Sequence, residues 1–256
     1  MITFYDITSK LDVKAWSPNT FKTRFALNYK GIPYKTEYVE YPDIASVLKN
    51  VGGAPTETKN GQDHYTLPAI HDSTTGKVIT DSANIAAYLD ETYPDKPALF
   101  PVFDNGKFET KAAILAFQSL FLEKWGAIRL VGLSGTHKIL TPRSAEYFKR
   151  TRETWFGKPI DDFAPPGPER EEMWRNLKEG LSVISELLDQ NVSKSEGKLF
   201  LFGDTLSYAD IIVSSFILWL KLVVGPESQE WKDFEQWNGG RWAKLLDKTK
   251  DIQGGN

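Results

Sequence analysis

A serine followed directly by a proline opens the first amphipathic stretch of the chain, SPNTFKTRFALNYKG from Ser17. Proline suits the first helical position because its missing N–H loses no partner there, and serine is a preferred N-cap. Phe21 and Phe25 fall on one face of this helix, and Gly31 ends it. The residues leave two interpretations of Ser17 open: a structural cap and a catalytic hydroxyl.

A proline also interrupts an apolar strand, YTLPAIH from Tyr65. Proline removes a donor from the strand ladder, so it is normally confined to edge strands and bulges. One interpretation is an edge strand with a trans Pro68. The other is a cis Leu67–Pro68 bond, which would turn the N–H and C=O of Leu67 outward to pair with an extended peptide.

Asp81 and Ser82 stand at the start of a third chemically suggestive stretch, DSANIAAYLDETY. Short polar side chains at this position are ordinary helix caps, and capping is the commoner explanation. The same helix terminus also offers free N–H groups and a favourable dipole to a carboxylate. Both roles stay open from the residues alone.

Composition limits the chemistry that these residues can support. The 256 residues include no cysteine, which excludes catalysis by a protein thiol, so a nucleophilic sulfur has to come from a ligand. The 31 basic and 34 acidic residues give a net charge of −3 without a run of five or six like charges, which argues against a nucleic-acid surface. The three histidines lack metal-ligand spacing, and no dinucleotide or Walker glycine pattern occurs.

The elements that must position these residues change in type along the chain. Short apolar runs alternate with helical stretches in the order β-α-β-α-β-β-α, which predicts an α/β domain over residues 1–94. A turn-rich segment from Asp95 marks the boundary. From Lys107 onward only helical spacing recurs, which predicts an all-α domain over residues 104–256. Its helices are expected at residues 112–122, 145–155, 169–188, 208–224 and 231–246.

Three further segments bear on stability and location. Ser207 and Asp210 have the spacing of a capping box at the start of the most apolar helix. The apolar run from Ile211 to Val224 suits a buried core helix rather than a membrane span, and the first residues read as a strand without a leader, so we expect a cytoplasmic protein. The segment GKPIDDFAPPGPER from Gly157 is expected to be an ordered loop between helices.

Taken together, in this order and spacing, these stretches resemble the glutathione transferase superfamily along nearly the whole chain. The resemblance rests on WSPNTFKTRFALNYKGIPY from Trp16, the Leu67–Pro68 pair, the Asp81–Ser82 pair and the S-x-x-D box at Ser207. The SP-x-x-x-K/R start is most similar to the serine-containing fungal class related to bacterial β-etherases.

This resemblance implies a thioredoxin-like N-terminal domain that binds glutathione and a helical domain that supplies a hydrophobic acceptor site. It implies that Ser17 donates a hydrogen bond to the glutathione sulfur, with Asn19 and Thr20 as alternatives in the same helical turn. The Leu67 backbone, before cis Pro68, would pair with the cysteinyl unit. Asp81 and Ser82 would hold the γ-glutamyl end. The residue for the glycyl carboxylate stays open among Lys49, Gln62 and His64.

The implied activity is a glutathione transferase that attacks hydrophobic, aromatic electrophiles in detoxification of xenobiotics, with etherase-type cleavage as a related reaction. The alternative is a ligandin that binds aromatic or phenolic compounds without turnover, and a domain serving only assembly is a remote third. The resemblance implies a homodimer, and the residues themselves lead us to expect no metal. Five aromatic residues are candidates for the acceptor wall, although most are expected in the core: Trp125, Trp155, Phe156, Phe163 and Trp219.

Overall fold

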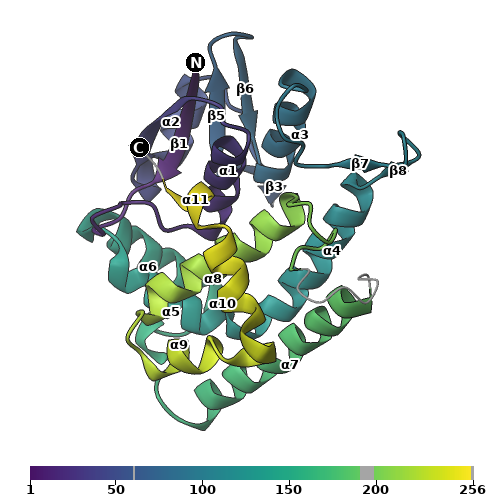
Figure 1. Cartoon of the computed structure of the whole chain (residues 1–256). Coiled ribbons are helices and arrows are strands. Elements are labelled where there is room, and N and C mark those ends of the chain that lie inside the picture. The colour runs from purple at the N-terminus through teal and green to yellow at the C-terminus, as the bar shows by residue number, and fades with distance from the viewer. Residues whose placement is uncertain (60, 191–198, 255–256) are drawn as a thin grey trace. The chain divides into compact units, whose positions relative to one another are not determined.

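The computed structural model describes residues 1–59, 61–190 and 199–254 (Figure 1). The chain divides into two compact units. Unit 1 comprises residues 1–99, 139–148 and 251–256, and unit 2 comprises residues 100–138 and 149–250. Unit 1 therefore takes in two segments that lie far along the sequence from its main part.

Unit 1 is built on a four-stranded sheet in the order β2-β1-β5-β6. The strands are β1 (Ile2–Ile7), β2 (Tyr34–Val39), β5 (Ala69–Asp72) and β6 (Lys77–Thr80). β1 and β2 are parallel, whereas β5 pairs antiparallel with β1 and with β6. Every residue of β1 is buried, as expected for a central strand covered on both faces. The mixed sheet confirms the α/β prediction for the N-terminal part.

Three helices accompany this sheet: α1 (Pro18–Tyr29), α2 (Ile44–Asn50), which follows a 3₁₀ turn at Tyr41–Asp43, and α3 (Ser82–Thr92). α1 packs against α3. A hairpin of β3 (Glu57–Lys59) and β4 (Gln62–His64) occupies a stretch for which no strands were predicted. Its residues are polar and mostly exposed, so they lack the alternation of apolar and polar residues that predicts a strand.

A buried ion pair holds α1 on the sheet. Arg24 Nη2 of α1 lies 2.7 Å from Asp6 Oδ2 of β1, and both side chains are almost completely buried. The guanidinium also donates to the hydroxyls of Tyr34 and Tyr38 in β2. Burial raises the pKa of Asp6, and the adjacent Arg24 opposes that rise. Removing one partner of such a pair typically costs about 3–5 kcal/mol, so this contact holds α1 against β1.

The segment Ile139–Phe148 is anchored to unit 1 by hydrogen bonds. The Lys10 N–H donates to the Ile139 carbonyl at 3.0 Å, and the Tyr41 N–H donates to Ser144 Oγ at 2.9 Å. The Thr141 hydroxyl donates to Glu40 Oε2 at 2.6 Å. These bonds tie the segment to β1's following loop and to the turn before α2.

Unit 2 is mostly helical. Its helices are α4 (Lys111–Trp125), α5 (Arg129–Ile139), α6 (Pro142–Phe156), α7 (Pro168–Gln190), α8 (Tyr208–Val224), α9 (Gln229–Phe234) and α10 (Arg241–Lys248), of which α5 and α6 extend into the Ile139–Phe148 segment; α11 (Lys250–Gln253) follows. α4 packs against α7 and α8, and α10 packs against α8. α8 is buried along most of its length, as its apolar sequence predicts.

The structure corrects three expectations for this part of the chain. α5 was not predicted. The stretch 231–246 is two helices rather than one, because Asn238, Gly239 and Gly240 adopt positive φ angles that interrupt it. A small hairpin, β7 (Val102–Phe103) with β8 (Phe108–Glu109), extends past the point where strands were expected to stop.

Candidate functional site

The strand register of unit 1 brings three of the predicted site segments to one edge of the sheet, namely the edge at which β1 and β6 end and β5 begins. Ala69, the first residue of β5, pairs with Tyr5 near the end of β1 on one side and with Thr80, the last residue of β6, on the other. The loop from β1 to α1, the Leu67–Pro68 step and the β6–α3 junction therefore share that edge. Segments that are more than 60 positions apart in the sequence therefore lie next to one another.

Ser17 occupies the N-cap position of α1 with an extended backbone and is 4% exposed. Its side chain makes no capping hydrogen bond to the described residues. Pro18 at the first helical position matches the prediction, and the Phe21 N–H closes the first turn on the Ser17 carbonyl at 2.9 Å. The hydroxyl is therefore not committed to capping, which the residues alone could not decide.

The two alternative donors in the first turn of α1 differ in their surroundings. Asn19 is exposed. Thr20 is completely buried, and its hydroxyl donates to the Ser17 carbonyl oxygen at 3.2 Å. A hydrogen bond from Thr20 also acts on the buried Asp6, where it favours the carboxylate. The Thr20 hydroxyl thus makes its hydrogen bonds within the interior of unit 1.

The loop before Ser17 is held by its own polar contacts. The Trp16 indole N–H donates to the Thr8 carbonyl at 3.2 Å, and the Ser9 hydroxyl donates to the Lys14 carbonyl at 2.7 Å. Tyr38 of β2 donates to the Val13 carbonyl at 3.2 Å. These bonds fix the loop and with it the position of Ser17, in the way that supporting contacts fix a functional group.

The Leu67–Pro68 peptide bond is cis, which confirms one of the two predicted alternatives. β5 begins only at Ala69, so the proline stands before the strand rather than within it. Leu67 lies outside the register that pairs β5 with β1 and β6. Lys49 lies close to this segment, because its ammonium is 5.1 Å from the centre of the Tyr65 ring.

Asp81 is the N-cap of α3, and Ser82 is the first residue of the helix. Asp81 Oδ1 accepts hydrogen bonds from the Ala83 N–H at 2.9 Å and the Asn84 N–H at 3.0 Å, which confirms the predicted cap. The Asp81 backbone adopts φ = +72°, a left-handed value that costs a non-glycine residue of order 1 kcal/mol. Polar residues with a strained backbone are often found at functional sites, and Asp81 lies at the same sheet edge as Ser17 and Leu67.

Lys22 lies near the Asp81 cap, and the sequence alone predicted no role for it. Burial lowers the pKa of Lys22 to about 8, and the Asp81 carboxylate acts against this shift. The interaction places the Lys22 ammonium of α1 within electrostatic reach of the α3 cap. The sequence signal for this residue is a lysine little more than one turn after Ser17 in a helix that is otherwise expected to be buried.

The five aromatic candidates for an acceptor wall separate by burial. Trp125, Phe163 and Trp219 are buried in unit 2, as core residues are expected to be. Trp155 is 58% exposed, with the Arg152 guanidinium 4.3 Å from its ring centre, and Phe156 lies against Phe163. At least three of the five therefore serve the core.

No helix among residues 1–59, 61–190 and 199–254 is both long and apolar enough to cross a membrane. The same part of the chain contains no group of three or more His, Asp or Glu side chains arranged to hold a metal ion.

Family models match both parts of the chain. Residues 16–92 match the glutathione S-transferase N-terminal domain, and residues 112–251 match the glutathione S-transferase C-terminal domain. The first match contains Ser17, the Leu67–Pro68 step and the β6–α3 junction. The chain belongs to the glutathione S-transferase family, with a thioredoxin-like N-terminal part and a mostly helical C-terminal part.

Individual relatives agree with this assignment. The glutathione S-transferase-like protein ustS of Aspergillus flavus is 36% identical over 94% of this chain and 87% of its own length. A crystal structure of a glutathione S-transferase of Ceriporiopsis subvermispora in complex with glutathione has a TM-score of 0.92 and 46% identity, covering 100% of this chain and 98% of that one. Glutathione transferase GSTFuA3 from Phanerochaete chrysosporium has a TM-score of 0.90 and 41% identity, with coverage of 100% and 98%.

Proposed function

We propose that this protein is a glutathione transferase in which Ser17 activates the thiol of bound glutathione for attack on hydrophobic, aromatic electrophiles. The observation that carries the proposal is the Ser17 hydroxyl, which stands at the N-terminus of α1 without a capping bond to the described residues. It stands at the sheet edge that also presents Leu67 and Asp81. The relative crystallised with glutathione supports the choice of thiol.

The physical basis is stabilisation of a thiolate. A free thiol has a pKa of about 8.5, so only a few per cent is ionised at neutral pH, and the thiolate is the attacking species. A hydroxyl donor and the positive end of the α1 dipole both favour the anion. The protein has no cysteine, so the sulfur that attacks is that of glutathione.

The remaining site residues hold the tripeptide. The Leu67 backbone, next to Pro68, pairs with the cysteinyl unit in the manner of an added strand. Asp81 and Ser82 hold the γ-glutamyl end, where the carboxylate of Asp81 complements the ligand's ammonium and the N-terminus of α3 complements its carboxylate. Asn19, exposed in the first turn of α1, remains the alternative sulfur donor. Thr20, the other alternative in that turn, is less suited because it is completely buried and its hydroxyl already donates to the Ser17 carbonyl.

The acceptor class and biological setting follow from the resemblance of the sequence and from the relatives. The proposed acceptors are hydrophobic aromatic electrophiles, including aryl ethers, in detoxification of xenobiotics. The serine at the start of α1 and the fungal origin of the relatives support the fungal class related to β-etherases. We propose a cytoplasmic homodimer.

The test is the ultraviolet absorbance of the glutathione thiolate, titrated with pH in the bound state. Wild type is expected to ionise the bound thiol well below the pKa of free glutathione, and Ser17→Ala to lose that shift while still binding glutathione. Asn19→Ala and Thr20→Val are matched controls in the same turn, and both are expected to keep the shift. Loss of the shift in one of them, and not in Ser17→Ala, would reassign the donor.

An unshifted thiol in the wild-type complex would contradict thiol activation. Ser17 would then be a structural residue, and the ligandin alternative, binding of aromatic or phenolic compounds without turnover, would replace the enzyme. Turnover separates the two as well: an activating hydroxyl affects the rate of conjugation far more than glutathione affinity, whereas a positioning residue affects both equally.

A further inference from the structure

Two asparagine–glycine steps lie in tight turns of unit 2 with opposite surroundings. Asn105–Gly106 forms the tip of the β7–β8 hairpin, and Asn238–Gly239 lies in the turn between α9 and α10. Both asparagines have a positive φ, +51° at Asn105 and +50° at Asn238, as this pair of residue types favours. The same pair is prone to lose its side-chain amide, because glycine has no side chain to shield its backbone nitrogen.

The Asn105 step is open to solvent. The Lys107 N–H donates to the Asp104 carbonyl at 3.1 Å, which closes a two-residue turn over Asn105 and Gly106. Both turn residues are exposed, and a Cβ atom added at Gly106 would meet nothing within 4 Å. Within the part of the chain that the structure describes, the Asn105 side chain has no hydrogen-bond partner. The hairpin extends away from the start of α4, so its tip is accessible to water (Figure 1).

Little free energy holds this hairpin tip closed. β7 and β8 have two residues each, and their register pairs Val102 with Glu109 and Phe103 with Phe108. Phe103 packs against Phe202 with ring centres 5.6 Å apart, which anchors the hairpin below its tip. Val102 and Phe108 are exposed. Because a two-stranded hairpin of this size is marginally stable in water, its tip can open while the rest of the unit stays folded.

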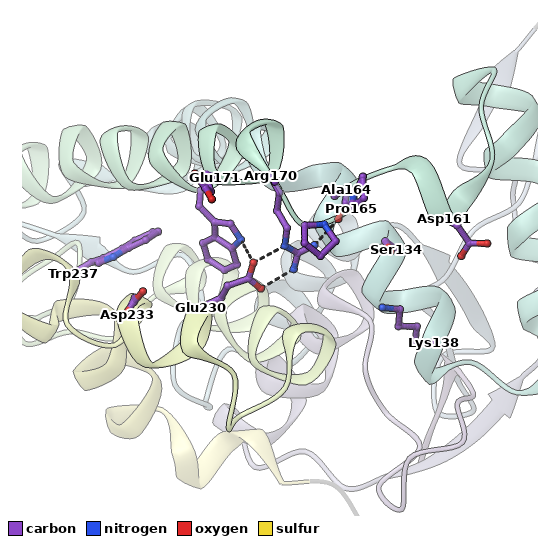
Figure 2. Close-up of a pocket in the computed structure, with 13 residues that line it drawn as sticks. Ser134, Lys138, Asp161, Ala164, Pro165, Arg170, Glu171, Glu230, Asp233 and Trp237 are labelled. Atoms are coloured by element: carbon purple, nitrogen blue, oxygen red, sulfur yellow. Dashed lines mark hydrogen bonds and ion pairs between the residues drawn. The ribbon is translucent and has the colours of Figure 1, made fainter.

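The Asn238 step is held at both ends of its amide. Asn238 Nδ2 donates to Ser182 Oγ of α7 at 3.0 Å, and Asn238 Oδ1 accepts from the indole N–H of Trp242 at 2.8 Å. Trp242 is completely buried. Trp237, the preceding residue, lines a pocket of unit 2 and packs edge-to-face on Trp174 with ring centres 5.9 Å apart (Figure 2). Asn238 therefore cannot turn its amide toward the next backbone nitrogen without breaking these contacts.

We propose that Asn105 is a site of spontaneous deamidation and that the contacts of Asn238 protect the second step. When the hairpin tip opens, the backbone nitrogen of Gly106 loses its proton to solvent and attacks Cγ of Asn105. The new N–C bond forms as the Cγ–Nδ2 bond breaks, and the side-chain nitrogen takes up a proton from water and leaves as ammonia. Water then adds to either carbonyl of the five-membered imide, which gives aspartate or isoaspartate.

Either product changes the hairpin tip. Aspartate adds a second carboxylate next to Asp104, and isoaspartate adds a carbon to the backbone, which the two-residue turn does not fit. Asn105 has no part in the site assigned to glutathione, and the two belong to different units. The modification is therefore independent of the thiol chemistry.

The test is peptide mapping by tandem mass spectrometry after incubation of the folded protein in warm, mildly alkaline buffer. Asn105 is expected to convert at least about tenfold faster than Asn238, because its step opens at a much lower free energy. Protein isoaspartate methyltransferase with labelled S-adenosylmethionine then detects isoaspartate at Asn105. The same incubation in urea is the control, since the two steps are expected to react at similar rates once the fold no longer separates them. The third Asn–Gly step, at Asn60, lies outside the described residues and falls on a separate tryptic peptide.

Ser182→Ala tests the protection of the second step. It removes the partner of Asn238 Nδ2 from a half-buried position on α7, and circular dichroism checks that the fold persists. Asn238 is expected to convert several-fold faster in this variant, whereas Asn105 in the same sample serves as the internal control and keeps its rate. Equal rates at Asn105 and Asn238 in the folded wild type, or an Asn105 that converts only in urea, would overturn the proposal. An unchanged Asn238 rate in Ser182→Ala would overturn the protective role of the hydrogen bond.

Discussion

Asp81 combines two roles that a single substitution can separate. Its Oδ1 atom caps α3 through two backbone hydrogen bonds, and its carboxylate supplies the charge that we assign to the γ-glutamyl ammonium. Its backbone has a positive φ of +72°, and asparagine and aspartate both occur at positive φ more often than most other non-glycine residues. Asparagine therefore keeps the cap and the backbone but removes the charge.

We predict that Asp81→Asn weakens glutathione binding about tenfold with little change in stability. The lost term is one charge-assisted contact of about 1–2 kcal/mol, whereas the amide oxygen still accepts from the Ala83 and Asn84 N–H groups. Calorimetric titration measures the affinity, and thermal unfolding measures the stability. Asp81→Ala serves as the contrast, with lower affinity and an unfolding free energy reduced by about 1 kcal/mol or more.

Unchanged affinity in Asp81→Asn would show that the carboxylate only caps the helix. The residue types at this site were predictable from sequence because serine, aspartate and proline each have a strong local preference for caps and turns. The hydrogen bonds that each side chain makes were not predictable from the sequence. Ser17 and Asp81 read as equivalent caps, yet only Asp81 makes the capping bonds, since that depends on orientation at the sheet edge.

At the scale of the elements, α5 and α8 approach closely because α5 carries glycine where they meet. A Cβ atom added at Gly135 would lie 2.5 Å from the Val223 carbonyl oxygen, and one added at Gly132 would overlap the Trp219 ring. The Trp219 indole N–H donates to the Thr136 hydroxyl at 3.0 Å across the same contact. The two glycines of GLSGT, residues 132–136, thus have a packing role.

We predict that Gly135→Ala lowers the unfolding free energy by about 2 kcal/mol. The backbone oxygen of Val223 cannot rotate away, and overpacking of this kind costs about 1–3 kcal/mol, which outweighs the better helix propensity of alanine. Chemical denaturation measures the change. Gly126→Ala is the control, because a Cβ there has open space and a helical backbone, so it is expected to be neutral or slightly stabilising. Equal effects in the two variants would contradict the packing role.

The start of α8 is expected to make stability depend on pH. Asp210 accepts from the Ser207 N–H and hydroxyl, both at 2.8 Å, and from the Leu201 N–H at 2.8 Å. Burial nevertheless raises the pKa of Asp210 to about 6. The unfolded chain releases this proton near pH 4, so the folded state binds more protons between pH 4 and pH 6. This residue's contribution to the unfolding free energy therefore falls as pH rises through that window.

We predict that the contribution is of the order of 2–3 kcal/mol and that Asp210→Asn removes it. The variant loses an acceptor for the Ser207 N–H, so it is less stable overall, but its unfolding free energy should lack this fall between pH 4 and pH 6. Urea denaturation across that range measures both curves, and their difference isolates Asp210 from other acids such as Asp6. Parallel curves would show that Asp210 titrates normally.

Element types were predictable where one period dominated a long stretch. The apolar run of α8 and the amphipathic α7 indicated helices whose ends agree closely with the structure. Prediction failed where a local backbone state decided the outcome. The positive φ angles at Asn238, Gly239 and Gly240 split one expected helix, and the polar β3–β4 hairpin has no apolar period to detect.

At the scale of the whole molecule, the end of the sequence returns to unit 1. Residues 251–254 belong to that unit, and Asn28 near the end of α1 donates from Nδ2 to the Ile252 carbonyl at 2.8 Å and also to the Gly254 carbonyl. Asn28 Oδ1 accepts from the Tyr34 hydroxyl at 3.1 Å. No local pattern could have predicted a pairing across 224 positions, because nothing in the sequence near either partner requires the other.

We predict that Asn28→Asp lowers the unfolding free energy by about 1–2 kcal/mol. The substitution keeps the acceptor for Tyr34 and replaces the donor to Ile252 and Gly254 with an oxygen that repels both carbonyls. It also places a negative charge in the last turn of a helix, which costs about 0.5 kcal/mol by itself. Asn50→Asp is the matched control, because Asn50 is the exposed last residue of α2 and carries only that second cost. Amide hydrogen exchange should show faster opening of the α1 C-terminal turn and of residues 250–254 in Asn28→Asp alone. Similar losses of stability in the two variants would show that the helix dipole, and not the anchored end of the chain, accounts for the effect.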